Sequence, residues 1–211
     1  MKKRNKIFGK KFLIYDFLRF TGALPGLIWY RPKFVYENEA AKKRIRGGAV
    51  LIANHVGFAD PIYCMYAVWY RRQHFICLKE LYDHKPRWIF HNILTIPIDR
   101  ENFNMNSLRE IADELSDGSV VTLFPEGHIN SSGELATFKS GMVLMALRGK
   151  APIVPLYVRE KKHFWSRVVF VFGEAVDVNE RYGPRPTMAQ IEEVTVLLKE
   201  KEEDLRKLAG E

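Results

Sequence analysis

The chain has 211 residues, of which 47% are hydrophobic and 27% charged, a balance typical of a globular protein rather than a disordered one. Its formal net charge of +8 favours phosphate-rich partners, which include nucleic acid, anionic lipid and phosphorylated substrates. Two cysteines, Cys64 and Cys77, are too few for a disulfide framework, and no cluster of Cys and His has the spacing of a zinc site.

The N-terminal segment is basic and then apolar, with six cations and no acid in its first eleven residues. Four apolar side chains recur at helical spacing: Phe8, Phe12, Tyr15 and Leu18. The apolar run at 20–30 is well short of the ~20 residues of a spanning helix. We therefore predict that residues 1–31 form an amphipathic helical segment lying in an anionic membrane surface, with Lys11 and Arg19 snorkelling from its apolar side. The alternative is a helix packed on the protein's own core.

A polar connection is predicted at residues 32–48, and the chain alternates between two patterns after it. Six apolar runs are predicted strands: Ala49–Ala53, His74–Leu78, Thr95–Ile98, Val120–Phe124, Ile153–Val158 and Val168–Phe172. Four helical patterns lie between most of them: Pro61–Tyr70, Pro86–Ile93, Ser107–Leu115 and Lys139–Leu147. This alternation predicts an α/β domain over residues 32–211, with a mainly parallel mixed sheet flanked by helices. No long helix separates the last two strands, so one of them is expected to pair antiparallel.

Two helices carry boundary signals of their own. Ser107 and Glu110 have the spacing of a capping box, and Gly118 follows as the stop. Thr187 and Gln190 are predicted to cap a final helix that extends to about Leu208.

The segment I-A-N-H-V-G-F-A-D-P, residues 52–61, follows the first of these strands. Gly57 permits a sharp turn, and Pro61 suits the first turn of a helix. His55 and Asp60 therefore share a tight loop at the carboxyl end of a strand, where sites of α/β proteins gather. An imidazole held by a carboxylate can take a proton from a hydroxyl. No Ser or Cys adjoins the pair, so the predicted nucleophile is the hydroxyl of the substrate.

Three further stretches end predicted strands with residues suited to binding: I-P-I-D-R, L-F-P-E-G-H and A-P-I-V-P-L. Arg100 can clamp a phosphate with two hydrogen bonds or instead form a salt bridge with Asp99 or Glu101. Glu126 is costly near a core unless it binds something, and Gly127 permits close approach to a ligand. Pro155, inside an apolar run, marks an edge or a bulge of the sheet.

In this order and spacing, these stretches resemble the glycerol-phosphate and lysophosphatidic acid acyltransferase family. That family carries the motifs N-H-x4-D, I-x-I-D-R, F-P-E-G and V-P, which read here as N-H-V-G-F-A-D, I-P-I-D-R, F-P-E-G-H and I-V-P-L. A K-E-L at 79–81 and S-S-G-E-L-A-T-F-K-S-G at 131–141 fit the same family. The resemblance covers roughly residues 50–158.

The resemblance implies that a fatty acyl group passes from a thioester of coenzyme A or acyl carrier protein to the hydroxyl of lysophosphatidic acid, which gives phosphatidic acid. It makes His55 the general base and Asp60 its orienting partner. The substrate-binding residues that it implies are Arg100, Glu126, Gly127, Lys79, His128 and Pro155. Among them, Arg100 would hold the phosphate of the acceptor. No metal or redox cofactor and no nucleic-acid partner is expected, and the protein is predicted to lie peripherally on the cytoplasmic side of the cell membrane.

Two departures from the family leave the acceptor open. Leu94 stands where the family usually has Gly, and residues 128–130 stand where Thr-Arg-Ser is common. Another lysolipid or glycerol 3-phosphate is therefore an alternative acceptor, and water would make the protein a thioesterase. A different class, a non-catalytic basic module for acidic lipid or nucleic acid, would suit the net charge, but the sequence lacks the signatures of nucleic-acid-binding folds.

Overall fold

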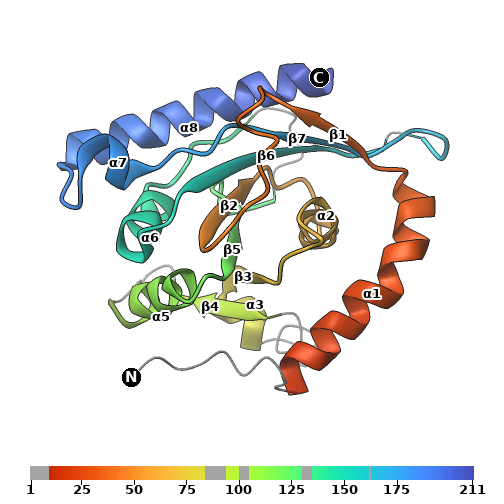
Figure 1. Cartoon of the computed structure of the whole chain (residues 1–211), viewed down its shortest axis with the longest axis horizontal. Coiled ribbons are helices and arrows are strands. Elements are labelled where there is room, and N and C mark those ends of the chain that lie inside the picture. Colours follow the sequence, from red (N-terminus) through yellow and green to blue (C-terminus); the bar gives the residue numbers. More distant parts are fainter. Residues whose placement is uncertain (1–9, 84–93, 100–104, 130–134, 162) are drawn as a thin grey trace.

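The computed structural model describes residues 10–83, 94–99, 105–129, 135–161 and 163–211. They form one seven-stranded sheet in the order β1-β7-β6-β2-β5-β3-β4, with helices on both faces (Figure 1). The strands are β1 (Lys33–Tyr36), β2 (Ala49–Ala53), β3 (Gln73–Leu78), β4 (Thr95–Ile98), β5 (Val120–Leu123), β6 (Ile153–Arg159) and β7 (Val169–Phe172). The helices are α1 (Lys10–Tyr30), α2 (Asp60–Ala67), α3 (Lys79–Asp83), α5 (Met105–Ser116), α6 (Gly141–Gly149), α7 (Val178–Tyr182) and α8 (Met188–Ala209).

The sheet is mixed and mainly parallel, which confirms the predicted fold class. β2 pairs in parallel with both β5 and β6, and β3 pairs in parallel with β4 and β5. The last two strands, β6 and β7, are antiparallel as expected. The carboxyl ends of β2 and β5 consequently lie side by side, and these two strands lead into the loops that carry His55 and Glu126.

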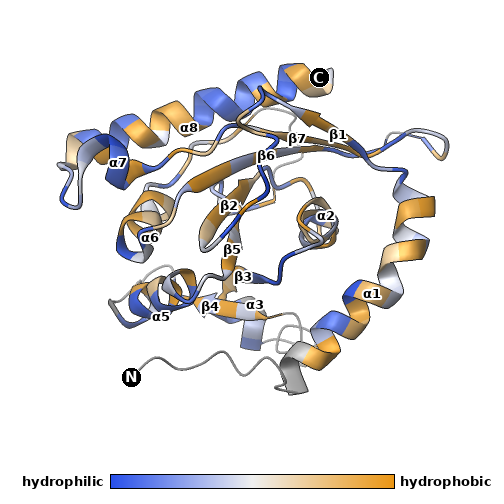
Figure 2. Cartoon of the chain, viewed as in Figure 1, coloured by the Kyte–Doolittle hydropathy of each residue, from blue (hydrophilic) through white to orange (hydrophobic). Residues whose placement is uncertain are grey.

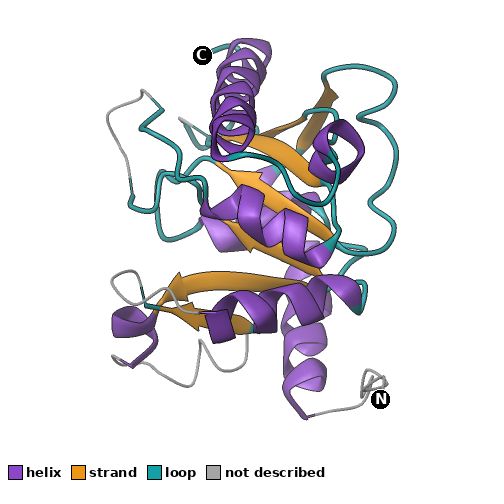
Figure 3. Ribbon diagram, turned by 90° about the vertical axis from the view of Figure 1, so that its left-hand side faces the viewer, coloured by secondary structure: helices purple, strands orange, loops and turns teal. Residues whose placement is uncertain are grey.

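Side chains of the buried central strand alternate between two hydrophobic cores. Val50 and Ile52 pack in the core that is covered by α5, α6 and the first half of α8. Leu51 points to the opposite core, beneath α2. Strands buried on both faces read as continuous apolar runs. Figure 3 shows helices crossing in front of the strands on one of these faces.

The predicted strand boundaries agree with the structure to within one residue, whereas the connection at 32–48 was wrong in part. Residues 33–36 form the edge strand β1, which pairs in parallel with β7. Three of these four residues, Phe34, Val35 and Tyr36, are apolar, but the run is short and mostly exposed. The strand depends on a partner far away in the sequence. The short helices α3 and α7 were also not predicted. The predicted helix at 86–93 lies outside the described residues.

The two predicted capping boxes have different outcomes. Thr187 and Gln190 form theirs, with each side chain bonded to the backbone N–H of the other residue. Ser107 does not cap a helix, because α5 already includes Met105. Since a helix interior tolerates serine, the S-x-x-E spacing alone did not locate this N-terminus.

Pro155 lies inside the sheet and not at its edge, because β6 has a partner on either side. Leu156 is opposite Phe172 and Ile153 is opposite Val176, so the partner strand carries one extra residue across this stretch. That mismatch is a β-bulge, which was the other prediction for this proline.

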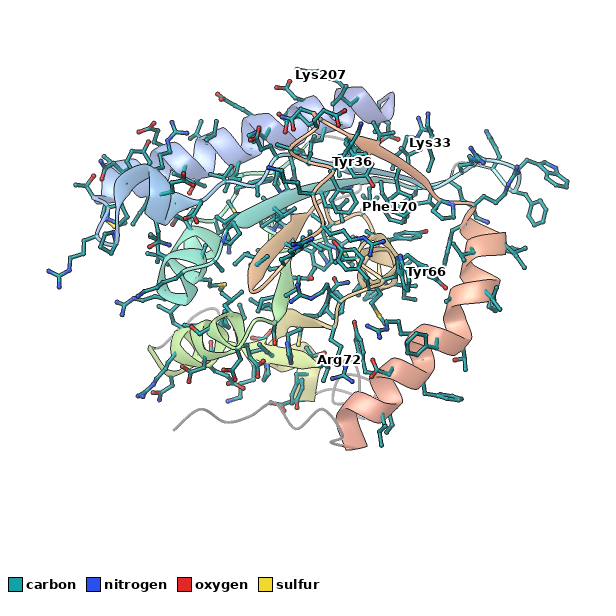
Figure 4. The ribbon with its side chains drawn as sticks, viewed as in Figure 1. Lys33, Tyr36, Tyr66, Arg72, Phe170 and Lys207 are labelled. Atoms are coloured by element: carbon teal, nitrogen blue, oxygen red, sulfur yellow. The ribbon has the colours of Figure 1, made fainter. Side chains whose placement is uncertain are left out.

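Helix α1 is fixed to the α/β body by one of its faces. Tyr15 is fully buried, and its hydroxyl accepts the backbone N–H of Gln73 at 3.2 Å. Asp16 pairs with Arg72 at 2.5 Å. The Tyr66 hydroxyl contacts the helix backbone, and a Cβ at Gly26 would overlap it. Figure 4 shows Tyr66 and Arg72 between the body and α1.

Arg19 does not snorkel from the apolar side, since it lies beside Asp16 at 3.2 Å on the attached side of α1. The opposite face of α1 is apolar and open to solvent, and Figure 2 shows apolar residues along most of the helix. Its exposed members are Leu13, Ile14, Phe17, Phe20, Leu24, Leu27 and Ile28. Within the described residues, every helix is too short or too polar to traverse a bilayer.

Candidate active site

His55 and Asp60 meet as the sequence predicts. The Nδ1 atom of His55 lies 2.7 Å from Oδ2 of Asp60, and the side chains are 18% and 3% exposed, respectively. An ionised carboxylate only accepts hydrogen bonds, so Nδ1 carries the proton and Nε2 keeps a free lone pair. His55 lines a large cavity of about 1380 Å³. The pair therefore presents a base to that cavity.

Asp60 also shapes the loop that carries the histidine. Its Oδ2 atom accepts the backbone N–H groups of Val56 at 2.7 Å and Gly57 at 2.9 Å, in addition to the imidazole. Asp60 is the first residue of α2, where a negative charge is favoured by the helix dipole. One carboxylate thus closes the turn and fixes the ring.

Glu126 connects this loop to a neighbouring segment. Its Oε1 atom accepts the backbone N–H of His55 at 3.3 Å, and Oε2 accepts that of Ala136 at 3.1 Å. The side chain is buried, and Glu126 is not among the residues that line the cavity. In its described contacts, Glu126 therefore links the backbone of His55 to the backbone of Ala136. Its contact with an acceptor stays a prediction.

The residues beside Glu126 do face the cavity. Gly127 and His128 both line it, and Gly127 has a φ of +73°, which glycine adopts without strain. The exposed imidazole of His128 lies 3.0 Å from the carbonyl oxygen of Glu126 through Nδ1. Both residues therefore face the cavity, and their contact with an acceptor stays a prediction.

Other predicted binding residues lie apart from the cavity or outside the described residues. Lys79 is exposed at the start of α3, and Pro155 is buried in β6; neither lines the cavity. Arg100 lies outside the described residues. Its neighbour Asp99 directly follows β4.

Two residues of the quoted motifs have structural roles that the sequence analysis missed. Asn54 ties β2 to β6, since its side chain donates to the carbonyl of Val158 at 3.0 Å and accepts its N–H at 2.8 Å. The Phe124 ring stacks on the imidazole of His55, with centroids 4.2 Å apart and an interplanar angle of 15°. The only sequence signal for Asn54 was its place next to His55, and the only one for Phe124 was its place before Pro125-Glu126-Gly127.

The cavity has a volume of about 1380 Å³ and mostly apolar walls. Its walls come from distant parts of the chain, including Leu27 of α1, Ile62 of α2, Phe75 of β3 and Met142 of α6. Lys139, in the F-K-S-G part of the quoted 131–141 stretch, adds a cation to the lining. Sequence reasoning could not assemble these walls, because the elements that supply them are spread along the chain from α1 to α6.

Leu94, one of the departures from the family pattern, has a φ of +54°. This left-handed conformation costs a residue with a Cβ ~1–2 kcal/mol. Glycine avoids that cost, which is a physical reason for the family's usual residue. In this chain the buried leucine side chain packs in the core beneath α2 and offsets the strain.

Glu202, on α8, is a third buried carboxyl, after Asp60 and Glu126. It is fully buried, and neither of its oxygens has a hydrogen-bond partner among the described residues. Burial first, and then the charge of Glu126, raise its pKa well above the ordinary value for glutamate. The folded protein therefore keeps this carboxyl protonated at a pH where the unfolded chain has lost the proton.

Glu202 is expected to make the protein less stable as the pH rises. Above the ordinary glutamate pKa only the unfolded state ionises freely, so the free energy of unfolding falls by up to ~1.4 kcal/mol per pH unit until the folded carboxyl ionises. Glu202→Gln should remove this contribution and gain stability over the original protein between pH 5 and pH 8. Urea unfolding at pH 5 and at pH 8 measures the free energy of unfolding of each protein.

Glu200→Gln, exposed on the same helix, is the control. The same change in the free energy of unfolding between the two pH values for all three proteins would contradict the prediction.

The fold agrees with comparisons to known proteins. A family model described as Acyltransferase matches residues 33–159, more than half of the chain. The fold is similar to the crystal structure of the 1-acyl-sn-glycerophosphate (LPA) acyltransferase PlsC from Thermotoga maritima, with a TM-score of 0.65 and 19% identity over 100% of this chain and 85% of that one. The chain belongs to the acyltransferase family.

Within that family, the chain is similar to enzymes named 1-acyl-sn-glycerol-3-phosphate acyltransferase. The Bacillus subtilis enzyme is 33% identical over 51% of this chain and 54% of its own length. The Limnanthes douglasii enzyme is 27% identical over 71% of this chain and 53% of its own length. The chain thus spans about half the length of these curated relatives.

Proposed function

We propose that the protein transfers a fatty acyl group from a thioester of coenzyme A or acyl carrier protein to the hydroxyl of lysophosphatidic acid, forming phosphatidic acid for phospholipid synthesis. The observation that carries this proposal is the His55–Asp60 pair at an apolar cavity large enough for acyl chains. Similarity to enzymes named for this reaction supports it.

In the proposed reaction, Nε2 of His55 takes the proton of the acceptor hydroxyl as its oxygen attacks the thioester carbonyl. Asp60 stabilises the imidazolium that forms. The tetrahedral intermediate then collapses, the carbon–sulfur bond breaks, and the departing thiolate takes the proton from the imidazolium. The residues of the chain supply a base and its orientation, and no metal or redox group enters these steps.

The two thiols are poorly suited to carry an acyl intermediate. Burial raises the pKa of Cys77 to about 12 and that of Cys64 still higher. The nucleophilic form of cysteine is the thiolate, which is scarce at neutral pH in both cases. This supports direct attack by the hydroxyl of the acceptor.

The cations that would favour a phosphorylated acceptor are Arg100, as the family resemblance implies, and Lys139, which lines the cavity. Of the other predicted acceptor-binding residues, Gly127 and His128 also line the cavity. An assay that offers lysophosphatidic acid, glycerol 3-phosphate and neutral lysolipids in parallel, with labelled acyl donor, tests the acceptor. Product from neutral lysolipids alone would oppose a phosphate contact, and free fatty acid as the main product would make water the acceptor.

Peripheral attachment to the cytoplasmic side of the membrane is part of the proposal. Phe20 and Leu27 belong both to the exposed face of α1 and to the cavity lining, and the cavity also includes the exposed side chains of Phe58 and Trp69. An acyl chain can therefore pass from a bilayer that contacts α1 into the cavity along apolar surface. The net positive charge favours an anionic bilayer.

A triple substitution on α1 tests this attachment. Phe17→Ser, Leu24→Ser and Ile28→Ser change exposed residues that do not line the cavity. The three lose apolar area that would be buried in the bilayer, so binding to vesicles containing phosphatidylglycerol should weaken by about 100-fold or more. Sedimentation with vesicles measures it. Unchanged binding would oppose attachment through α1, whereas truncating the helix would remove the buried Tyr15 and confuse the result.

A further inference from the structure

The loop between β6 and β7, residues 160–168, carries two large aromatic side chains in solvent. Phe164 is 60% exposed and Trp165 is 77% exposed. Neither lines the cavity of the candidate active site. Clustered exposed apolar groups of this size mark a surface for interaction.

These aromatic groups are held in place by contacts with the end of α1. The Phe164 ring meets Trp29 edge-on at 5.4 Å between centroids and Trp165 at 5.0 Å. Lys161 places its Nζ 3.6 Å from the centroid of the Trp29 ring. Arg31 donates a hydrogen bond of 3.1 Å to the backbone carbonyl of Trp165. Figure 1 shows the loop beside the last turn of α1. The four apolar residues Ile28, Trp29, Phe164 and Trp165 are called the aromatic platform below.

Cations surround the platform. Arg31, Lys33 and Arg167 are exposed, and Lys33, labelled on β1 in Figure 4, donates its backbone N–H to the carbonyl of Val168 at the end of the loop. The acidic residue in the described part of the loop is Glu160, which is partly buried and hydrogen-bonded with Tyr63. Exposed aromatic rings ringed by Lys and Arg match the boundary of an anionic bilayer, where rings sit at headgroup depth and cations meet phosphates.

We infer that the aromatic platform is a second membrane-docking element, which inserts Phe164 and Trp165 into the headgroup region of an anionic bilayer. The inference rests on the proposed attachment through α1 and extends it. Ile28 and Trp29 make the platform continuous with the exposed face of that helix.

A second contact would fix the orientation of the protein on the surface. A helix that binds alone can roll about its own axis, and the cavity beside α1 would then turn with it. The loop contacts the end of α1 through Trp29 and Arg31, so insertion of loop and helix together would restrain rolling and keep the apolar entrance of the cavity against the lipid. Phe164 and Trp165, which the proposed chemistry does not use, would thereby orient the protein on the membrane.

Fluorescence quenching tests the depth of the loop directly. The sequence has four tryptophans, so changing Trp29, Trp69 and Trp88 to Phe leaves Trp165 as the single emitter. With vesicles of phosphatidylglycerol and phosphatidylcholine brominated near the headgroup end of the acyl chain, Trp165 emission should shift to the blue and be quenched. Unquenched Trp165 in the vesicle-bound protein would overturn the inference.

A binding experiment provides the second arm. The double variant Phe164→Ser/Trp165→Ser should bind these vesicles about 10- to 100-fold more weakly. The matched control, Met188→Ser/Val196→Ser, removes two exposed apolar side chains from α8 and should bind normally. Equal binding by both double variants would contradict the role of the loop.

Activity with substrate dispersed in detergent separates this inference from the proposed reaction. There the double variant should transfer acyl groups at the original rate, because it alters no residue of the cavity. Absence of transfer by the unaltered protein would remove the proposed reaction but leave the vesicle results to decide the role of the loop.

Discussion

Replacing His55 by alanine is expected to lower the rate of acyl transfer by a factor of about 10²–10⁴, the usual contribution of a positioned general base. The fold should survive, because Asp60 keeps its hydrogen bonds from the backbone of Val56 and Gly57 without the imidazole. Steady-state transfer to lysophosphatidic acid measures the first effect, and thermal unfolding measures the second.

His163→Ala, an exposed histidine outside the cavity, is the matched control in detergent and should keep full activity. Asp60→Asn should also reduce the rate, since an amide does not hold the ring in the same tautomer with the same charge. A His55 variant that is folded and fully active would remove the basis of the proposed mechanism.

Glu126→Gln is expected to reduce transfer while revealing what Glu126 does. Its two oxygens accept backbone N–H groups from His55 and Ala136, and glutamine can accept only one of them through its carbonyl. The other N–H would be left buried against an amide donor, at a cost of ~1–3 kcal/mol. Because the link from the His55 loop to Ala136 is then broken, the imidazole is held less firmly, and kcat should fall by about tenfold or more.

The kinetic constants distinguish the two roles of this carboxylate. If Glu126 positions His55, kcat falls and the KM for the acceptor stays near its original value. If Glu126 contacts the acceptor, as the family resemblance implies, the KM for the acceptor rises. Glu193→Gln, which alters an exposed ion pair with Arg181, is the control for a charge change alone.

The loop that carries His55 and Asp60 was predictable because its contacts are local. His55 and Asp60 lie five residues apart, with a glycine between them and a helix start after them, so chain geometry alone brings the side chains together. The strands were equally clear, because parallel strands buried on both faces show as uninterrupted apolar runs. The antiparallel pairing of β6 with β7 followed from the absence of a long crossover helix.

Features that depend on distant partners were not predictable in this way. The edge strand β1 is defined by its pairing with β7, and its three apolar residues were too short a run to mark a strand without that partner. The sequence also did not show which face of α1 packs on the α/β body and which face is open to solvent. Tyr15 seemed to belong to an apolar membrane face but is buried in the body, and Arg19 lies on the attached side beside Asp16.

The sequence by itself determined most of the strands and helices along the chain, the α/β class and the contact of His55 with Asp60. Each of these follows from periodicity or short-range spacing. Only the tertiary structure decided which neighbours those groups have. It placed Glu126 against the backbone of His55, closed an apolar cavity from many separate elements, and joined the loop at 160–168 to the end of α1. These contacts join residues far apart in the chain, and their formation depends on how the helices pack on the sheet.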